Sequence, residues 1–205
     1  MPREAEVKFL QIDPDAVRAS LRESKAGFLG RRFEQNLVFD TPQRSLRQQD
    51  ILLRLRQDGD ATLTLKRRPR HPGPPGVKVK DEIETRVADF EATRTLLQAL
   101  GYDVAFRYEK IRETWRLYSC TVCLDTLPFG DFLELEAGDR IEDLEQAARA
   151  LGLDPTQASS ATYHELNQDY RRRNALPPDE SFVFQTAPEF DYPSPGDSLV
   201  EKDEA

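Results

Sequence analysis

The stretch VKVKDEIETRV (residues 77–87) reads as a β-strand whose two faces differ in chemistry. Successive side chains of a strand point to opposite sides, so every second residue shares a face. One face is mostly apolar, with Asp81 interrupting the valines and the isoleucine. The other face is charged at five successive positions, namely Lys78, Lys80, Glu82, Glu84 and Arg86. An unbroken charged row needs an explanation, because a solvated strand face usually mixes charges with neutral polar residues.

The same division of faces recurs in other strand-like runs. Charged residues stand at alternate positions of these runs, at Glu4, Glu6, Lys8, Arg54, Arg56, Lys66, Arg68, Lys110, Arg112, Glu134 and Glu136. An ordinary sheet with its charged side toward water is one interpretation. The predicted helices need an apolar sheet surface to cover, however, so we favour charged faces that point inward. We therefore predict an α+β fold with a closed antiparallel β-barrel, a charged lumen and helices packed outside. A barrel of eight strands is about wide enough to hold one small ligand.

Capping and turn signals divide the chain into short elements. Asp13-Pro14 combines an N-cap with proline at the first helical position, which predicts a helix to about Ala26. Further helices are expected at about 89–100, 141–151 and 160–174. Strands are expected at 3–10, 33–40, 51–57, 61–68, 77–87, in three short pieces between 104 and 127, and at 131–137. The segment PRHPGPPG (69–76) is expected to be a loop that contains His71.

Composition limits the class of protein and its partners. The chain has 205 residues, enough for one domain with a sizeable core, and a formal net charge of -8. That charge argues against general binding to nucleic acid or to an anionic membrane. No apolar run approaches the roughly 18 residues of a transmembrane helix, and the N-terminus lacks a signal pattern, so we expect a cytoplasmic protein. The oligomeric state stays open between monomer and homodimer.

The C-terminal part of the chain differs in composition from the rest. We expect one domain over residues 1–176, followed by an acidic, proline-rich, flexible tail over 177–205. An FVF patch at 182–184 could pack on the domain.

The only two cysteines, Cys120 and Cys123, form a C-x-x-C pattern. This spacing occurs in redox and zinc sites. The run LYSCTVCLDTL (117–127) reads as a strand, however, in which residues three apart lie on opposite faces. We therefore expect two ordinary strand thiols.

The charged set has the chemistry of a site for a metal-bound polyphosphate. Its carboxylates offer the oxygen ligands that hard divalent cations prefer, from Glu4, Glu6, Glu82, Glu84, Asp125, Glu134 and Glu136. Its bases suit phosphate oxygens, and they are Lys8, Arg54, Arg56, Lys66, Lys80, Lys110 and Arg112. Burial of unpaired charge is costly, so the acids and bases must offset one another. The chain has no P-loop motif, so the phosphates are not expected at a helix N-terminus.

The ordered set of motifs resembles the CYTH superfamily, also called triphosphate tunnel metalloenzymes. That group includes class IV adenylate cyclases, thiamine triphosphatases and inorganic triphosphatases, and its fold is an eight-stranded antiparallel barrel. The resemblance covers about residues 3–173, through EAEVK (4–8), FDTPQRSL (39–46), LLRLR (52–56), LTLKRR (63–68), KDEIE (80–84), YEKIRETW (108–115) and LDTLPFGDFLELE (124–136). Two positions depart from the family pattern. Val38 replaces a frequent tyrosine, and Ala161 replaces a base, although Tyr163 is kept.

The resemblance implies that the acidic set coordinates one or two Mg²⁺ or Mn²⁺ ions and that the basic set binds a triphosphate. The leading hypothesis is a metal-dependent hydrolase of inorganic triphosphate or of an organic or nucleoside triphosphate. Lys8, with Glu4 and Glu6, is expected to orient the attacking water or assist proton transfer. The alternative is an adenylate cyclase that converts ATP to cyclic AMP and diphosphate. A third interpretation is a non-catalytic module that binds polyphosphate or a nucleotide.

Overall fold

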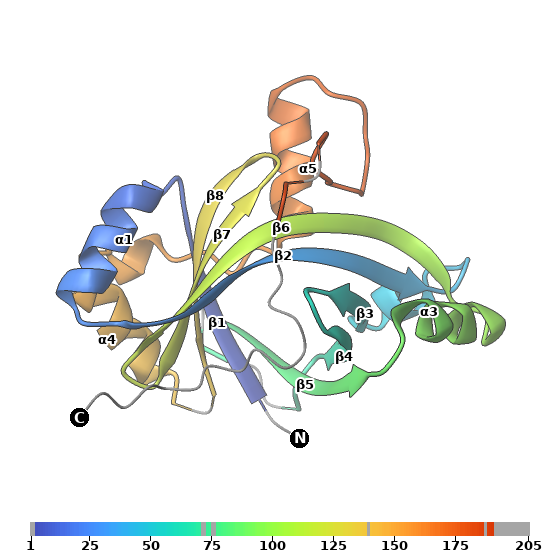
Figure 1. Ribbon diagram of the computed structural model, residues 1–205, viewed down its shortest axis with the longest axis horizontal. Helices are drawn as coiled ribbons and strands as arrows, with labels where there is room; N and C mark the ends of the chain where they lie inside the picture. The colour runs from blue at the N-terminus through green and yellow to red at the C-terminus, as the bar shows by residue number, and fades with distance from the viewer. Residues whose placement is uncertain (1–2, 71–72, 75–76, 139, 187, 191–205) are drawn as a thin grey trace.

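The computed structural model describes residues 3–70, 73–74, 77–138, 140–186 and 188–190. Its strands form one closed, strongly curved sheet, with helices outside it (Figure 1). The strands are β1 (Arg3–Leu10), β2 (Gly27–Asp40), β3 (Leu52–Gln57), β4 (Ala61–Arg67), β5 (Lys78–Val87), β6 (Asp103–Leu117), β7 (Cys120–Leu127) and β8 (Gly130–Ala137). The helices are α1 (Pro14–Glu23), α2 (Ser45–Gln48), α3 (Phe90–Ala99), α4 (Glu142–Ala150) and α5 (Tyr163–Arg173), with a 3₁₀ turn at Pro155–Gln157.

The eight strands close in the order β1-β5-β4-β3-β2-β6-β7-β8, and each neighbouring pair is antiparallel. Closure removes the exposed sheet edges that would otherwise pair with other chains. This ring confirms the predicted eight-stranded barrel.

The register between β1 and β8 shows how the two faces are sorted. Lys8 lies opposite Glu134 and Glu6 opposite Glu136, whereas Val7 lies opposite Leu135. Residues directly opposite one another share a face of the sheet. The charged pairs therefore face the lumen and the apolar pairs face outward, as the alternation predicts.

Two helices, α1 and α3, begin at the capping residues that the sequence predicted. The carboxylate of Asp13 accepts from the backbone N–H of Asp15 at 3.0 Å, with Pro14 at the first helical position of α1. Asp89 accepts from Ala92 N–H at 2.9 Å at the start of α3. A side-chain oxygen in this position satisfies a backbone donor that has no partner within the helix.

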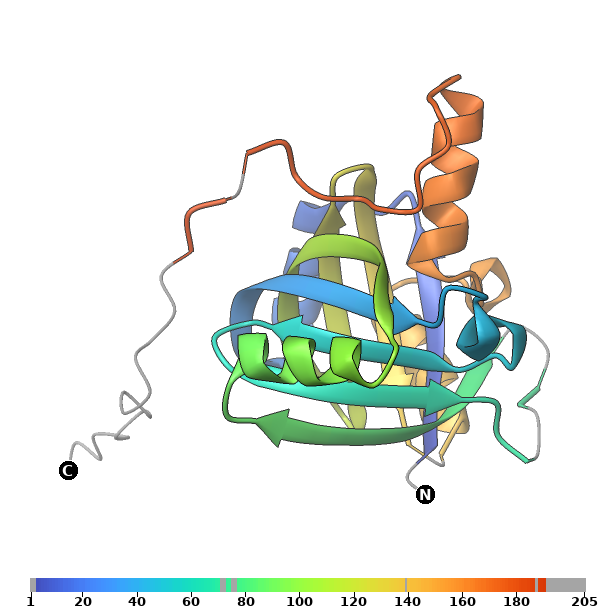
Figure 2. The ribbon, with the colours of Figure 1, turned by 90° about the vertical axis from the view of Figure 1, so that its right-hand side faces the viewer.

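Apolar clusters fix the helices to the outer face of the barrel. α1 and α4 lie side by side at one end, and α3 lies at the other (Figures 1 and 2). Val17 and Leu21 of α1 and Leu144 of α4 belong to one buried cluster with β1, β7 and β8, whereas Leu97 of α3 packs with β2 and β3. At roughly 25 cal/mol per Å² of buried apolar area, these clusters are the main favourable contribution to folding.

The sequence-based element boundaries were wrong in three places. Residues 103–117 form one strand of 15 residues, not two short ones, because β6 pairs with β2 along almost its whole length. β2 begins at Gly27, before the expected residue 33, and a register shift between Phe28 and Gly30 accommodates a stretch without regular alternation. The short helix α2 was not predicted, since four residues are too few to show a helical period.

Both cysteines are buried and free, as expected. Cys120 belongs to the outer apolar cluster with α1 and α4. Cys123 lies opposite Glu134 in the β7–β8 register and therefore faces the lumen. The two thiols of the C-x-x-C pattern are thus on different faces of β7.

Part of the C-terminal segment packs against the barrel. Phe182 is buried in a cluster with Phe132 and Leu127, and it forms a parallel bridge to Tyr108 of β6. Phe182 of the FVF patch therefore packs on the domain, an arrangement that the sequence left open. The flexibility expected of the tail over 177–205 stays a prediction, and residues 187 and 191–205 of this tail, like the loop residue His71, lie outside the described residues. In the described part of the chain, no helix has the length and apolar character needed to cross a membrane.

Candidate functional site

The barrel encloses one large cavity of about 680 Å³ lined by charged side chains from most of the strands. Every predicted site residue except Asp125 lines it, namely Glu4, Glu6, Lys8, Arg54, Arg56, Lys66, Lys80, Glu82, Glu84, Lys110, Arg112, Glu134 and Glu136. A cavity of this size is in the range that holds one small ligand. The structure thus brings together residues that lie up to about 130 positions apart in the chain.

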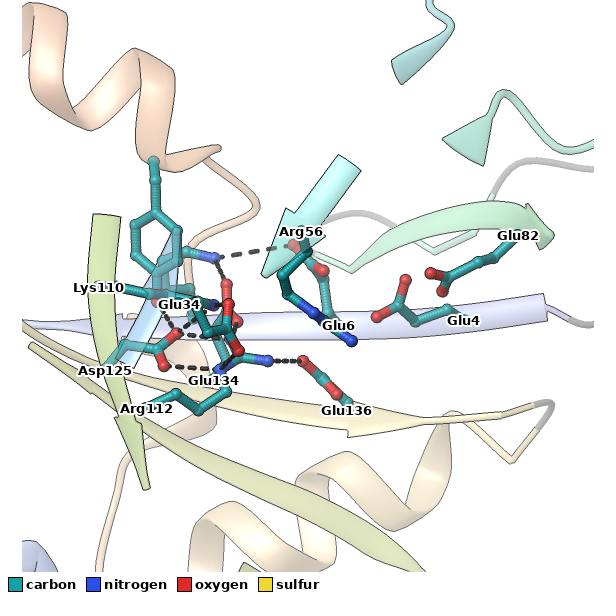
Figure 3. Close-up of polar contacts among 12 residues, drawn as sticks. Glu4, Glu6, Glu34, Arg56, Glu82, Lys110, Arg112, Asp125, Glu134 and Glu136 are labelled. Atoms are coloured by element: carbon teal, nitrogen blue, oxygen red, sulfur yellow. Dashed lines mark hydrogen bonds and ion pairs between the residues drawn. The ribbon is translucent and has the colours of Figure 1, made fainter. Parts of the chain in front are cut away.

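Arg112 of β6 is the centre of the ion-pair network (Figure 3). Its guanidinium donates to Asp125 at 2.7 and 2.6 Å, to Glu136 at 3.1 Å and, by a shorter contact, to Glu134. Burial alone would lower the pKa of Arg112, but the surrounding carboxylates raise it well above its ordinary value. Arg112 therefore stays charged and organises three acids at once.

Lys8 is almost completely enclosed, with 1% of its surface exposed. Its ammonium donates to Glu134, lies 3.7 Å from Glu6 and sits 4.4 Å from the centre of the Tyr163 ring. Burial opposes its charge, but Glu134 and Glu6 outweigh burial and raise the pKa of Lys8. Lys8 is therefore protonated near neutral pH and can donate hydrogen bonds but cannot accept a proton.

Four glutamates of β1 and β8 fall into two groups by their electrostatic balance. Burial opposes ionisation of these four, but Lys8 and Arg112 lower the pKa of Glu134 well below its ordinary value, and Lys78 lowers that of Glu6. Burial and the neighbouring acids instead raise the pKa of Glu4 and of Glu136. The positive charge around these two carboxylates does not offset the effects of burial and of the neighbouring acids.

Glu4 is the better defined of the two under-neutralised acids. It accepts from Lys66, which also lies 3.4 Å from Glu82, and the carboxylates of Glu4 and Glu82 are neighbours (Figure 3). The charge of Glu6 adds to the repulsion at Glu4. A cation placed among these oxygens would relieve that repulsion.

Two further basic residues of the lumen, Arg54 and Arg56, lie on β3. Arg54 donates to the hydroxyl of Tyr108 at 3.1 Å and to that of Thr64 at 3.3 Å. Arg56 lies 3.0 Å from Asp58 and 3.7 Å from Glu84. Glu84 is at the open end of the lumen, where 41% of its side chain is exposed. These arginines have few charged partners compared with Arg112.

Asp125 occupies a different position from the one expected of a metal ligand. It is fully buried, does not line the cavity, and lies behind Arg112 and Lys110. The hydroxyl of Tyr163 donates to its Oδ2 at 2.7 Å. Its contacts suit a residue that orients the bases and holds α5 against the barrel.

Sequence reasoning missed several residues of the site. Glu34 of β2 lies 3.5 Å from Lys110 and 3.9 Å from Arg112, and Asn36 follows it on the same face. Glu34 is followed on its strand face by the neutral residues Asn36 and Val38, and an isolated charge is too little to identify a charged face from the sequence. Glu34 and Asn36 contact or adjoin the bases without lining the cavity, whereas Lys78, Asp50, Arg44, Arg47 and Tyr108 line it. Arg44 precedes α2 as its N-cap and Arg47 lies within this four-residue helix, which is too short to show a period that would indicate the direction of a side chain.

The inner wall near β2 and β3 contains buried polar atoms without a hydrogen-bond partner in the described structure. They are both amide atoms of Asn36 and Nε of Arg54. Oε2 of Glu34 and Nε of Arg56 also lack a hydrogen bond, but each has an ion-pair contact, with Lys110 at 3.5 Å and with Asp58 at 3.0 Å. Buried polar groups are normally paired, so atoms of this kind fit a lumen that binds a polar ligand or water.

The donor chemistry fits a hard divalent cation, although the acids are now paired with bases. Among the described residues, no three His, Cys, Asp or Glu side chains are gathered closely enough to form a metal site. Glu4, Glu82 and Glu136 nevertheless supply oxygen ligands on neighbouring walls (Figure 3), and the raised pKa of Glu4 and Glu136 indicates a local excess of negative charge. Oxygen-only donors suit Mg²⁺ or Mn²⁺ better than soft metals.

The pH dependence of the free energy of unfolding below about pH 5 should depend on Glu34. Burial opposes its charge, but Lys110, Arg112, Arg56 and Arg54 together lower the pKa of Glu34 from its ordinary value of 4.5 to about 2. A depressed carboxyl pKa stabilises the fold above pH about 4.5, and this stabilisation is lost as the pH falls toward about 2. We expect Glu34→Gln to flatten the pH dependence of the unfolding free energy over this interval and to lower stability at pH 7.

Urea denaturation at pH 3, 5 and 7 would measure this effect, with the exposed Glu91→Gln in α3 as control. Equal slopes of stability against pH for Glu34→Gln and the native protein would contradict the assignment.

Comparison with known proteins identifies relatives of the chain. The family model described as CYTH domain matches residues 2–163. “Putative adenylate cyclase MJ0240” from Methanocaldococcus jannaschii is 27% identical over 176 residues, which cover 80% of this chain and 97% of the relative. The crystal structure of a “putative adenylate cyclase” from Vibrio parahaemolyticus is similar with a TM-score of 0.68 and 24% identity, over 80% of this chain and 97% of that one.

A third similar structure comes from Hippeastrum. It is named “Putative adenylyl cyclase HpAC1” and is said to reveal a dominant triphosphatase activity. The TM-score is 0.59 at 18% identity, over 88% of this chain and 99% of that one. At these identities the two structures show that the fold is shared.

Proposed function

Because the chain belongs to the CYTH domain family, we propose that it is a metal-dependent hydrolase of a triphosphate bound in the barrel lumen. The observation that carries the proposal is the interleaving of acids and bases in one cavity of about 680 Å³. A polyphosphate needs cations along its whole length, whereas a divalent ion needs carboxylates, and the cavity offers both. Hydrolysis would then require this lining, a divalent ion and a water.

Glu4, Glu82 and Glu136, with Glu6, Glu134 and Glu84 nearby, would hold one or two Mg²⁺ or Mn²⁺ ions. Bound there, the metal supplies a Lewis acid for the phosphoryl oxygens and a water of lowered pKa. We assign Asp125 to the orientation of Lys110 and Arg112, since it lies behind them and outside the cavity lining.

Arg54, Arg56, Lys66, Lys80, Lys110 and Arg112 would bind the phosphate oxygens and stabilise the charge that develops on the leaving diphosphate. Burial and Arg112 oppose the charge of Lys110, but Asp125 and Glu34 raise its pKa to about 12. It therefore binds as a cation at any physiological pH. When a phosphate enters, its oxygens would replace carboxylates as partners of these bases.

Lys8 would orient the attacking water or a phosphate oxygen. It is held between Glu134 and Glu6, and its raised pKa keeps it protonated. A protonated lysine cannot take the proton of the water as a general base. A carboxylate of the lumen that does not hold the metal is the better acceptor.

An adenylate cyclase is the second candidate. The relative from Methanocaldococcus jannaschii carries that name. The outer part of the cavity is also lined by apolar side chains that could contact a nucleoside, namely Val38, Ile51, Leu52 and Phe106. The same acids and bases of the cavity would then orient the ribose 3′-hydroxyl toward the α-phosphate.

Product analysis separates these functions. We expect the purified protein with Mg²⁺ or Mn²⁺ to release orthophosphate and diphosphate from inorganic triphosphate, and to lose this activity when EDTA removes the metal. Parallel incubations contain ATP and thiamine triphosphate. Cyclic AMP with diphosphate from ATP would instead identify a cyclase, and tight binding without turnover of any substrate would identify a binding module.

A further inference from the structure

The C-terminal segment after α5 forms part of the cavity wall. It turns back from α5 and crosses the barrel beside β6 (Figure 2). The N–H of Phe182 donates to the carbonyl of Arg107 at 3.0 Å, and the N–H of Glu109 donates to the carbonyl of Phe182 at 3.0 Å. β7 pairs with β6 only from Ile111 onward, so the segment adds to the part of the β6 edge that β7 leaves unpaired.

This arrangement places Glu180 at the mouth of the cavity, between two arginines. Its carboxylate lies 2.8 Å from Arg44 Nη2, forms a shorter contact with Arg47, and lies 3.6 Å from His164 Nε2. Arg44, Arg47 and His164 all line the same cavity as the charged lumen. Two guanidinium groups that meet at one carboxylate have the geometry that recognises an oxyanion.

The backbone holds the two arginines in place without Glu180. The buried carboxylate of Asp40 accepts from the N–H of Thr41 at 2.7 Å, Leu46 at 2.9 Å and Arg47 at 3.0 Å, which fixes the turn into α2. Arg44 has a left-handed backbone with φ of 58°, a conformation that non-glycine residues seldom adopt. Strained backbone of this kind is common at ligand sites, and here it orients a side chain toward the mouth.

Glu180 is held less firmly than the acids of the lumen. The exposed fractions of the side chains are 33% for Glu180, 38% for Arg44 and 57% for Arg47, whereas Glu134 and Lys8 are almost fully enclosed. Ion pairs that water reaches are weak and are screened by salt. Another anion can therefore compete with Glu180 for the two arginines.

We propose that Arg44 and Arg47 form a second anion-binding site at the mouth of the cavity, that it takes a phosphate oxyanion, and that Glu180 is its built-in, displaceable occupant. The inference deepens the proposed function, because the site opens into the same lumen. Its ligand is either a free phosphate or the outer end of a phosphate chain that reaches out of the lumen. While Glu180 is paired with Arg44 and Arg47, it lowers the affinity of this second site for either ligand.

Titration calorimetry of the full-length chain with orthophosphate, and separately with triphosphate in EDTA, tests the proposal. We expect Glu180→Gln to bind at least one of these anions about fivefold more tightly than the native protein, since two partly exposed ion pairs no longer compete. Glu142→Gln, an exposed acid in α4, removes the same charge elsewhere and should leave the affinity unchanged.

The gain should disappear when Glu180→Gln is combined with Arg44→Gln and Arg47→Gln. A gain with orthophosphate identifies a free-phosphate site, and a gain with triphosphate alone identifies the end of a chain bound in the lumen. No gain with either anion, or a gain that persists without the two arginines, would overturn the inference. Binding is measured without turnover, so a protein that hydrolyses no triphosphate still tests this site.

Thermal unfolding of each variant shows whether it is folded. Should Glu180→Gln prove unstable, Glu180→Asp keeps the charge but shortens the reach to the arginines, and a smaller gain of the same sign is expected. Looser or unchanged binding by a folded Glu180→Asp would then count against the proposal.

Discussion

Glu4→Gln should lower the rate of triphosphate hydrolysis by about 100-fold or more at a fixed Mg²⁺ concentration. Burial and the acids Glu6 and Glu82 raise the pKa of Glu4, which shows that its negative charge is poorly compensated by the protein. A divalent cation is the partner that this carboxylate lacks. Glutamine has almost the same shape but no charge, so the change removes a metal ligand with little change in packing.

Initial rates of orthophosphate release over a series of Mg²⁺ and Mn²⁺ concentrations would measure the effect. Part of the lost activity should return at high metal concentration, because the remaining acids still attract the ion. A Glu4→Gln protein that works at the native rate and native metal concentration would contradict a role for Glu4 in metal binding. Glu91→Gln, on the outer helix α3, is the matched control.

Stability provides a second, independent measurement for Glu4. A raised carboxyl pKa means that ionisation of Glu4 disfavours the folded state, and this cost is present above pH about 4.5 and is relieved as the pH falls. Glu4→Gln should therefore unfold at the same temperature as the native protein or at a higher one at pH 7. If the activity is lost and Tm also falls clearly, the loss would be explained by misfolding of the variant and not by the loss of a metal ligand.

Arg112→Met should have the largest effect on stability of any single substitution in the lumen. Its guanidinium is the partner of Asp125, Glu134 and Glu136 at once, and only 14% of its side chain is exposed. Removing one partner of a buried ion pair costs about 3–5 kcal/mol, because the remaining charges stay buried without compensation. For a domain of this size, a fall in Tm of about 10 °C follows.

The loss should depend on pH and on divalent ions in a defined direction. Without Arg112 the buried carboxylates lose their positively charged partner, and this loss raises their pKa values. Protonation of these carboxylates at pH 5 should therefore recover some of the stability that is missing at pH 8. Mg²⁺ should also recover part of it, since the freed acids can bind the ion. Calorimetric scans at both pH values, with and without Mg²⁺, would measure both effects.

Arg116→Met is the control for this experiment, because Arg116 is exposed on the same strand. A surface change of this kind is expected to alter stability by no more than about 0.5 kcal/mol. Equal effects of the two substitutions would show that the lumen network contributes little to folding.

The sequence allowed most of the site to be located, since a strand has a side-chain period of two. Once the charged face of each strand is assigned to the lumen, Glu4, Lys66 and Arg112 must all point inward wherever the strands lie. The same logic places Asp125 on the inward face, but it could not show that Arg112 and Lys110 lie between Asp125 and the cavity. It also missed Arg44 and Arg47, which lie at and within the short helix α2.

The sequence by itself determined the type of barrel, the faces of its strands and the caps of its helices, because these depend on local periodicity and on side chains next to the helix ends. Only the tertiary structure decided which acid meets which base, as in the pairing of Lys8 with Glu134 and of Lys66 with Glu4. It also decided that Glu180 reaches the mouth of the cavity. These contacts depend on the register and stagger of strands far apart in the chain, which no local pattern encodes.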